Sequence, residues 1–345
     1  MQALDTRKEI ILSAVIEDYI RNVEPVGSQR IIEDHGLGVS SATVRNELAF
    51  LEKTGYLFQP HTSAGRVPTD KGYRYYVDKL FKKRNNHIFF DEEFAFQTFS
   101  ATDNELEVLM HEASNLLSRL TNCVAFVFAP NIKKSYLKHL DLVLIRPQTV
   151  LMVLITNTGC VFKKVMDFNY EVSRVSLHNL EIVLNDKLTN LEFKKILEIS
   201  QNLIEFSPEI RDVAGRVMAQ ILNCIAGKEH ERIFLGGASN ILLQPEFRNS
   251  KKVQIILETL EQGDIIANLF DEILKPGAIS VKIGHENTKA EIHECSFIFG
   301  SYGTGEQNLG ALGILGPTRL DYLRVISIVG GTAKTLSHFV ECLYE

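Results

Sequence analysis

Apolar and polar residues in the first fifty-four positions alternate with the period of α-helices. Residues 4–22 carry an apolar stripe at 3.6-residue spacing, formed by Ile11, Leu12, Val15, Ile16 and Tyr19. A Pro-Val-Gly-Ser run ends this helix, and a short helix is predicted over 29–34 with Ser28 as its N-cap. A glycine-containing turn follows, and then Ser40 is predicted to cap a third helix over 41–54. This order of elements is the helix-turn-helix arrangement.

The third helix divides into a buried and an exposed face. Val44, Leu48 and Leu51 cluster on one side at 100° per residue. The first half of its other side and flanks offers hydroxyl, methyl, amide and guanidinium groups, from Ser41, Ala42, Thr43, Arg45, Asn46 and Ala49. In a DNA major groove Arg can read guanine, Asn can read adenine, and methyl groups can touch thymine. We therefore predict a recognition helix in which Arg45 and Asn46 read base edges.

The pattern changes to short strands directly after this helix. Residues 55–59 predict one strand, and a glycine-bearing loop over 61–68 returns into a second. A β-hairpin in this place is a wing, which would carry His61, Ser63 and Arg66 to phosphates or the minor groove. A basic, aromatic helix capped by Thr69 is predicted over 70–83. Flanking DNA contacts are expected from Ser28, Gln29, Lys71 and Arg74.

The remaining residues mix helical and strand-like patterns. Residues 89–101 are acidic and aromatic without strong periodicity and predict a linker. Helices are predicted over 103–120, 172–184, 192–203, 208–225, 250–260, 264–274 and 319–343. Strands are predicted over 123–128, 137–145, 150–156, 160–166, 232–235, 279–283, 295–299 and 309–315. This succession indicates an α+β multidomain protein.

Length and composition agree with that architecture. The 345 residues suggest two or three domains, and 45% apolar residues suffice for buried cores. No apolar run approaches the roughly 18 residues of a membrane span, and the first residues lack the apolar segment of a signal peptide. Five scattered cysteines without a CxxC pair fit a reducing compartment as buried thiols. A cytoplasmic protein is therefore expected.

Charge is unevenly distributed along the chain. The net charge is −6, yet residues 40–84 hold nine basic against four acidic side chains. A basic segment in an acidic protein suggests contact with a polyanion, because neutralised phosphates release counterions. A solvated charged face is the alternative that charge alone leaves open.

Signatures of catalysis are absent from the sequence. Glycine runs at 303–305 and 310–316 lack the ending of a P-loop and the strand-and-helix context of a dinucleotide site, so they favour turns and tight packing. His285, His293 and Cys295 come nearest to a metal cluster but lack a fourth ligand. Neither HExxH nor GxSxG occurs. We expect a protein that is not an enzyme and holds no cofactor or metal.

Several motifs resemble those of one known family. They are PVGS at 25–28, VSSATVRNE at 39–47, LEKTGYL at 51–57 and QPHTSAGRVPTDKGYR at 59–74, followed by GGASN at 236–240, QPEF at 244–247, SYG at 301–303 and GILGPTRLDY at 313–322. Together they closely resemble the heat-inducible transcription repressor family, HrcA. The resemblance covers essentially the whole chain, although residues 168–230 match by length and pattern more than by motif.

The resemblance implies a domain organisation. It implies a winged helix-turn-helix DNA-binding domain over 1–88, a linker over 89–101 and a GAF-like α+β domain. The GAF-like domain would comprise 102–148 and 245–345. An inserted α+β dimerisation domain would occupy 149–244, with a start between 149 and 169.

The resemblance also implies a function. A homodimer would repress chaperone operons through an inverted-repeat CIRCE-type operator on double-stranded DNA, with repression relieved by heat. The chaperonin GroEL is implied as a partner that keeps the repressor active. Two alternatives stay open from the residues: a regulator gated by a small molecule in its GAF-like domain, and a winged helix associated with RNA or a helicase.

Overall fold

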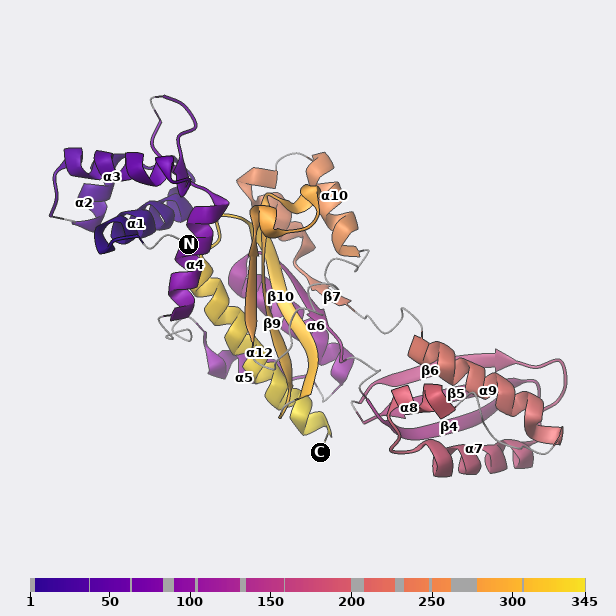
Figure 1. The fold of residues 1–345 in the computed structure, drawn as a ribbon. Coiled ribbons are helices and arrows are strands. Elements are labelled where there is room, and N and C mark those ends of the chain that lie inside the picture. Colours follow the sequence, from indigo (N-terminus) through magenta and orange to yellow (C-terminus); the bar gives the residue numbers. More distant parts are fainter. Residues whose placement is uncertain are drawn as a thin grey trace.

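The chain forms three bodies that Figure 1 shows one after another. The computed structural model describes residues 4–36, 38–62, 64–82, 90–102, 105–130, 135–157, 159–199, 208–226, 233–247, 250–261, 278–305 and 307–344. We call residues 4–82 the N-terminal unit and residues 135–226 the inserted unit. Residues 90–130 and 233–344 together form the central domain. The mixed α+β, multidomain class predicted from the sequence is confirmed.

The N-terminal unit contains the elements that its pattern predicts. They are α1 (Thr6–Asn22), α2 (Ser28–His35), α3 (Ser41–Lys53), β1 (Leu57–Phe58), β2 (Val67–Pro68) and α4 (Asp70–Lys82). The Asp5 carboxylate accepts the Lys8 N–H at the start of α1, and Ser40 Oγ accepts the Thr43 N–H at the start of α3. The prediction for Ser28 is wrong, because Gly27 occupies the N-cap of α2 and Ser28 is already helical. Its hydroxyl is turned toward α3 instead.

The central domain is a five-stranded antiparallel sheet with helices on both faces. Its elements are α5 (Glu92–Ser100), α6 (Leu106–Thr121), β3 (Val124–Phe128), β7 (Ile233–Gly236), α10 (Ser250–Glu261), β8 (Ile279–Ile283), β9 (Cys295–Thr304), β10 (Gln307–Pro317) and α12 (Tyr322–Tyr344). The strand order is β7-β3-β10-β9-β8. Every residue of β3 is buried, because Ala125 and Val127 face α6 and α12 while Val124, Phe126 and Phe128 face α10.

The inserted unit has its own sheet and its own core. Its elements are β4 (Leu137–Arg146), β5 (Thr149–Thr156), β6 (Val161–Asp167), α7 (Arg174–Leu188), α8 (Phe193–Ile199) and α9 (Pro208–Ala226). The three strands pair antiparallel in chain order, and the helices cover one face of the sheet. Alternate residues of β5, such as Val150, Met152 and Leu154, enter that core.

The sheets place the limits of the insertion differently from the sequence prediction. β4 pairs with β5, so the unit includes residues before the expected start at 149. β7 pairs with β3 in the central sheet, with Phe128 opposite Ile233, so the unit ends well before 244. Alternation of apolar and polar residues predicts a strand but does not indicate which sheet the strand joins. The limits of the inserted unit were therefore misplaced.

Residues 89–101 also differ from the expected linker, because residues 92–100 form α5. The Asp91 carboxylate caps this helix by accepting the Phe94 N–H at 3.0 Å. Ala95 and Phe99, four residues apart, are buried, and Phe99 packs edge-on against Phe339 of α12. The predicted helix over 264–274 lies outside the described residues.

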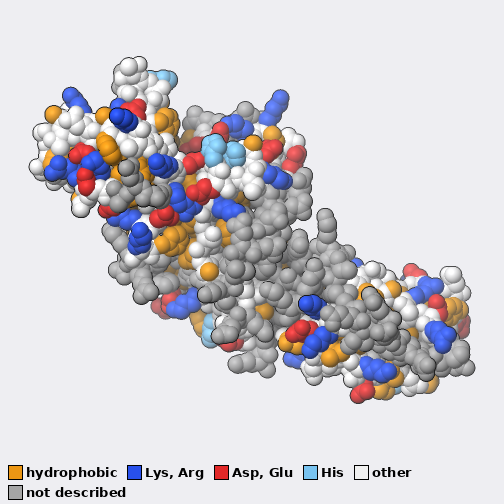
Figure 2. Space-filling view, viewed as in Figure 1, with side chains coloured by type: hydrophobic (Ala, Val, Ile, Leu, Met, Phe, Trp, Pro, Cys, Tyr) orange, Lys and Arg blue, Asp and Glu red, His pale blue; other side chains and the backbone are white. Residues whose placement is uncertain are grey.

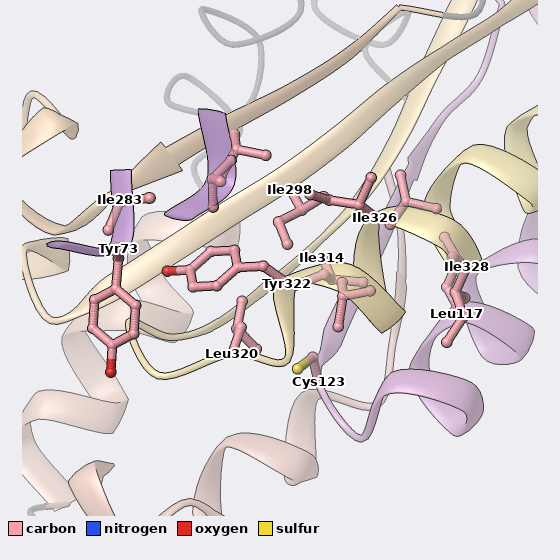
Figure 3. Packing of buried hydrophobic residues seen from close by; sticks show 14 of the residues in the cluster. Tyr73, Leu117, Cys123, Ile283, Ile298, Ile314, Leu320, Tyr322, Ile326 and Ile328 are labelled. Atoms are coloured by element: carbon pink, nitrogen blue, oxygen red, sulfur yellow. The ribbon is translucent and has the colours of Figure 1, made fainter. Parts of the chain in front are cut away.

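One apolar core continues from the N-terminal unit into the central domain. The same cluster contains Val44 and Leu51 of α3, Tyr73 of α4, Leu320 just before α12 and Tyr322 at its start. Figure 3 shows the ring of Tyr73 next to that of Tyr322, with Leu320 beside Tyr322 and farther from Tyr73. The N-terminal unit is therefore packed onto the central domain rather than tethered to it by chain alone.

Candidate nucleic-acid interface

The outward face of α3 has the composition that the sequence predicts. Val44, Leu48 and Leu51 are buried beneath it. Ala42, Arg45, Asn46 and Ala49 are exposed, while Ser41 and Thr43 at its flank are half-buried. The two exposed alanines leave the helix backbone open to close approach, and a guanidinium and an amide stand beside them. This face can offer hydrogen-bond donors and methyl groups to a groove.

A chain of hydroxyl groups connects α2 to the start of α3. Ser28 Oγ lies 3.3 Å from Ser41 Oγ and accepts a hydrogen bond from Arg45 Nε at 3.3 Å. Ser40 Oγ lies 3.0 Å from the Thr43 hydroxyl as well as capping the helix. The guanidinium of Arg45 is thus restrained through its Nε atom, and the donors on its two terminal nitrogens are not used in this contact.

Each acidic side chain of α3 has a basic partner from another element. Glu47 lies 3.2 Å from Lys8 Nζ of α1, and Glu52 lies 2.8 Å from Arg66 Nη2 of the hairpin. These pairs reduce the negative potential that two carboxylates on α3 would present to phosphates. The sequence prediction missed Lys8, because nothing in its spacing shows that α1 crosses α3 beside Glu47.

The hairpin after α3 projects from the N-terminal unit (Figure 1) and is anchored at its base. Val26 and Arg66 exchange backbone hydrogen bonds of 2.9 and 2.8 Å. Gly65 makes this possible, because a Cβ there would stand 2.4 Å from the carbonyl carbon of Val26. Gln59 Nε2 bridges the loop by donating to the carbonyls of Thr62 and Ala64. The loop is therefore built by its own hydrogen bonds.

The predicted hairpin residues have different surroundings. His61 is exposed in the loop, and Ser63 lies outside the described residues. The Arg66 side chain is largely covered, with Nη2 paired to Glu52 and Nε buried without a hydrogen-bond partner among the described residues. Arg66 thus braces the hairpin against α3, whereas the sequence predicts that it reaches phosphates or the minor groove.

Of the residues predicted to flank the DNA contact, Gln29 is exposed and Lys71 is bound to the N-terminal unit itself. Gln29 is exposed on α2, where its amide donates to Glu33 at 3.2 Å. Lys71 Nζ donates to the Thr54 carbonyl at 2.7 Å and lies 4.5 Å from the centre of the Tyr56 ring. Lys71 thereby satisfies a carbonyl at the C-terminal end of α3.

Arg74 does not have the position expected of a DNA contact. Its guanidinium is half-buried against the central domain, where Nε donates to Glu286 Oε1 at 2.7 Å and Nη2 donates to the Val281 carbonyl at 2.6 Å. The basic residues of α4 suggest a phosphate-binding surface. The actual partners of Arg74 lie more than two hundred residues away in sequence. Residues 281–286 gave no signal of this contact.

Charges of both signs are mixed on the visible face of the N-terminal unit. Figure 2 shows basic side chains interspersed with acidic ones there, rather than one continuous basic patch. Such a surface provides modest attraction for phosphates over its whole area. Specific contacts along α3 and the hairpin would therefore have to carry a larger share of any recognition.

Other chemistry has little support in the described parts of the chain. No three His, Cys, Asp or Glu side chains there gather closely enough to hold a metal ion. Burial raises the pKa of the Cys123 and Cys295 thiols to about 12, so neither ionises near neutral pH. Among the described helices, none has the length and apolar character needed to cross a membrane.

Comparison with known proteins identifies the family. The family model for the HrcA protein C-terminal domain matches residues 107–326. The heat-inducible transcription repressor HrcA of Desulforamulus reducens is 36% identical over 344 residues, which cover 98% of this chain and 97% of that protein. The chain belongs to the HrcA family. The HrcA repressor of Brevibacillus brevis is 37% identical over 344 residues, covering 99% of each protein.

A solved structure resembles the whole HrcA chain described here. A hypothetical protein with a crystal structure at 2.2 Å superimposes with a TM-score of 0.69 at 25% sequence identity. The superposition covers 99% of this chain and all of the other. The resemblance stated from the sequence motifs is thus confirmed, and membership of HrcA connects the protein with transcriptional repression and the heat-shock response.

Proposed function

We propose that this HrcA protein is a homodimer that represses transcription by binding a specific DNA sequence. The N-terminal unit would act as a winged helix, with α3 in the major groove and the hairpin over the adjoining backbone. The observation that carries the proposal is the outward face of α3, where Arg45 and Asn46 stand exposed between the small residues Ala42 and Ala49. A solvated structural helix would more often carry pairs of Glu and Lys on such a face.

Within this proposal the exposed groups have distinct roles. Arg45 and Asn46 would donate to base edges, and Ser41, Thr43 and Gln29 would contact phosphates at the groove margins. His61 at the hairpin tip would approach the minor groove or the backbone. Arg66 and Lys71 would act mainly by holding the hairpin and α4 against α3.

The homodimer is supported by the uncovered face of the sheet in the inserted unit. One row across its three strands is entirely apolar, with Val143 opposite Leu151 and Leu151 opposite Val165. Val165 is 61% exposed and Val143 48% exposed. Contiguous apolar surface of this kind is typical of a protein interface.

The next row of the same sheet face fits a symmetric contact. It runs from Asp141 through Val153 to Lys163, so opposite charges occupy the two edges. If two copies pack face to face about a two-fold axis along β5, Asp141 of one copy lies opposite Lys163 of the other. An isologous interface requires this self-complementarity.

A two-fold dimer would read an inverted repeat, because operator symmetry mirrors protein symmetry. We infer a CIRCE-type operator upstream of chaperone genes, repression relieved by heat, and the chaperonin GroEL as a partner, all from the family. The central domain would be the GAF-like domain of that family. The relatives' names give heat induction and no ligand, which favours this function over a metabolite-gated regulator.

Binding measurements with full-length protein test the proposal directly. Titrations would use a CIRCE-type duplex and a scrambled duplex of equal length at two salt concentrations, with sedimentation to give the oligomeric state. We expect tighter binding to the inverted repeat at both salt concentrations by a dimer. Equal affinity for both duplexes would overturn sequence-specific recognition, and a monomer bound to the repeat would overturn the dimer.

A further inference from the structure

Helix α4 uses two faces to join two parts of the molecule. Lys71, Tyr75 and Lys79, spaced four residues apart, face the N-terminal unit. Lys71 donates to the end of α3, while the Tyr75 hydroxyl and Lys79 Nζ both donate to Glu9 of α1. Figure 1 shows α4 between these helices and the start of α12. The orientation of α4 thus follows that of α1 and α3.

The opposite face of α4 is paired with the central domain by two charged contacts. Arg74 forms a two-pronged ion pair with Glu286 and also donates to the Val281 carbonyl at 2.6 Å. Asp70 Oδ2 accepts from the His285 backbone N–H at 2.9 Å and lies 2.7 Å from His285 Nδ1. Planar two-pronged pairing fixes direction as well as distance.

Close packing surrounds these charged contacts. Tyr73, on the same face as Asp70 and Arg74, is buried against Tyr322 with ring centres 5.7 Å apart (Figure 3). Gly284 has φ +53° and lies so close to Asp70 that a Cβ would stand 2.2 Å from its carboxylate oxygen. The backbone of the central domain is therefore shaped to receive α4.

We propose that Asp70, Tyr73 and Arg74 are positioning residues for operator recognition, which fix the angle of α3 relative to the central domain. We call their contacts with Val281, Gly284–Glu286 and Tyr322 the α4 clamp. This inference rests on the proposed function. In a dimer that reads two half-sites, a fixed angle at this joint restricts the separation and relative rotation of the two recognition helices. The α4 clamp therefore makes recognition selective for half-site spacing.

A preference for one half-site spacing distinguishes a positioning role from a role in stability, because a contact that only stabilises the fold would not change that preference. The test uses full-length wild type, Arg74→Gln and Glu286→Gln with operator duplexes whose half-sites are separated by the native spacer or by one or two base pairs more or fewer. One base pair rotates a half-site by about 35°. We expect wild type to lose at least tenfold in affinity on each altered spacer. Each variant should lose less than threefold.

Controls separate this effect from loss of folding and from a direct DNA contact. Glu294→Gln removes the carboxylate of another ion pair of the central domain, with Lys252 at 2.6 Å, and should keep the wild-type preference. Both test variants should melt as folded protein and bind a single half-site duplex as wild type does. The double variant should lose less spacing preference than the sum of the two single losses, because both single variants remove the same ion pair between Arg74 and Glu286.

The outcomes separate this inference from the proposed function. Wild-type preference retained in both variants, or no spacing preference in wild type, would overturn the positioning role. Loss of half-site affinity in Arg74→Gln alone would mean that Arg74 contacts DNA, and would overturn it as well. Failure of wild type to prefer any operator would instead refute the proposed function.

Discussion

At the scale of single residues, the exposed side of α3 combines long polar side chains with small neighbouring residues. Arg45 and Asn46 are exposed polar groups, yet their neighbours Ala42 and Ala49 are small. Small neighbours leave no long side chains to keep another molecule away from the helix. The Ser28 hydroxyl also restrains Arg45 through its Nε atom, which lowers the entropy lost when the terminal nitrogens bind.

Removing either polar group should relax base preference without unfolding the protein. Arg45→Ala and Asn46→Ala should each reduce the difference in binding free energy between operator and scrambled duplex by about 1–3 kcal/mol, the range for a bidentate base contact. Lys53→Ala, at the exposed end of the same helix, should weaken both duplexes alike. Competition titrations give the difference, and variants that discriminate as wild type does would refute base reading by these residues.

Gly65 of the hairpin should be sensitive to substitution. Gly65→Ala places a Cβ 2.4 Å from backbone atoms of Val26, so the paired hydrogen bonds between Val26 and Arg66 must separate. We expect a loss of about 1–3 kcal/mol in the free energy of unfolding, as for other overpacked sites. Gly215→Ala, at an exposed position of α9, has no such atom within 4 Å of the added Cβ and provides the control. Urea titrations of both variants would settle the comparison.

At the scale of elements, the uncovered sheet of the inserted unit presents the clearest unpartnered surface among the described residues. Val165→Asp introduces a charge at the β6 end of the apolar row of Val143, Leu151 and Val165, at its most exposed residue. Burying an unpaired carboxylate is costly, so we expect this variant to be monomeric where wild type is dimeric. Sedimentation velocity measures the change.

A second valine provides a matched control for the dimer. Val175 on α7 is 71% exposed and belongs to the helical layer, on the other side of the inserted unit from the apolar row. Val175→Asp should leave the dimer intact. If both variants are monomeric, or both are dimeric, the uncovered sheet face is not the interface.

The contact between α1 and α4 should weaken in acid. Hydrogen bonds from Tyr75 and then Lys79 lower the pKa of the Glu9 carboxyl below its ordinary value of 4.5. A carboxyl whose pKa is lowered by folding stabilises the folded state above its unfolded pKa, and this contribution disappears as pH falls through the folded pKa. Glu9→Gln should therefore be less stable than wild type at pH 7. Thermal melting should show that difference shrinking below about pH 4.

Helices and strands could be predicted from the sequence far better than the contacts between residues that are distant along the chain. Local signals determine α3: Ser40 caps it, and Val44, Leu48 and Leu51 recur on one face. The exposure of Arg45 and Asn46 followed from the same periodicity. The role of Arg74 could not be predicted, because its acceptors at Val281 and Glu286 come from a distant strand and turn. The overlooked α5 did have a local signal, namely the Asp91 cap with Ala95 and Phe99 four residues apart.

At the scale of the whole molecule, the inserted unit interrupts a pair of neighbouring strands. The end of β3 and the start of β7 lie side by side, since Phe128 is opposite Ile233 in an antiparallel pair. A short turn of two to five residues is enough to join such strands. The central domain therefore has no need of the inserted unit to complete its sheet.

Excision of the inserted unit should accordingly leave a folded monomer. Replacing residues 131–231 by a short Asn-Gly turn should preserve helical content and a cooperative melt, because Phe128 and Ile233 on the two strands to be joined already pair. Deleting 149–244 instead removes β7 and leaves β4 without its partner, so that protein should aggregate. Circular dichroism and sedimentation compare the two. A dimer after the first excision would place the interface elsewhere.

The middle strand of the central sheet, β10, is the last of its five strands to be synthesised. Its partner β3 ends at Phe128, and the helix that covers both, α12, comes later still. During synthesis the N-terminal and inserted units have all their own residues long before the central sheet can close. A nascent chain that has not reached Gln307 keeps the apolar surfaces of α6 and β3 without their permanent cover. Premature termination there should yield a species far more prone to aggregate than loss of either outer unit.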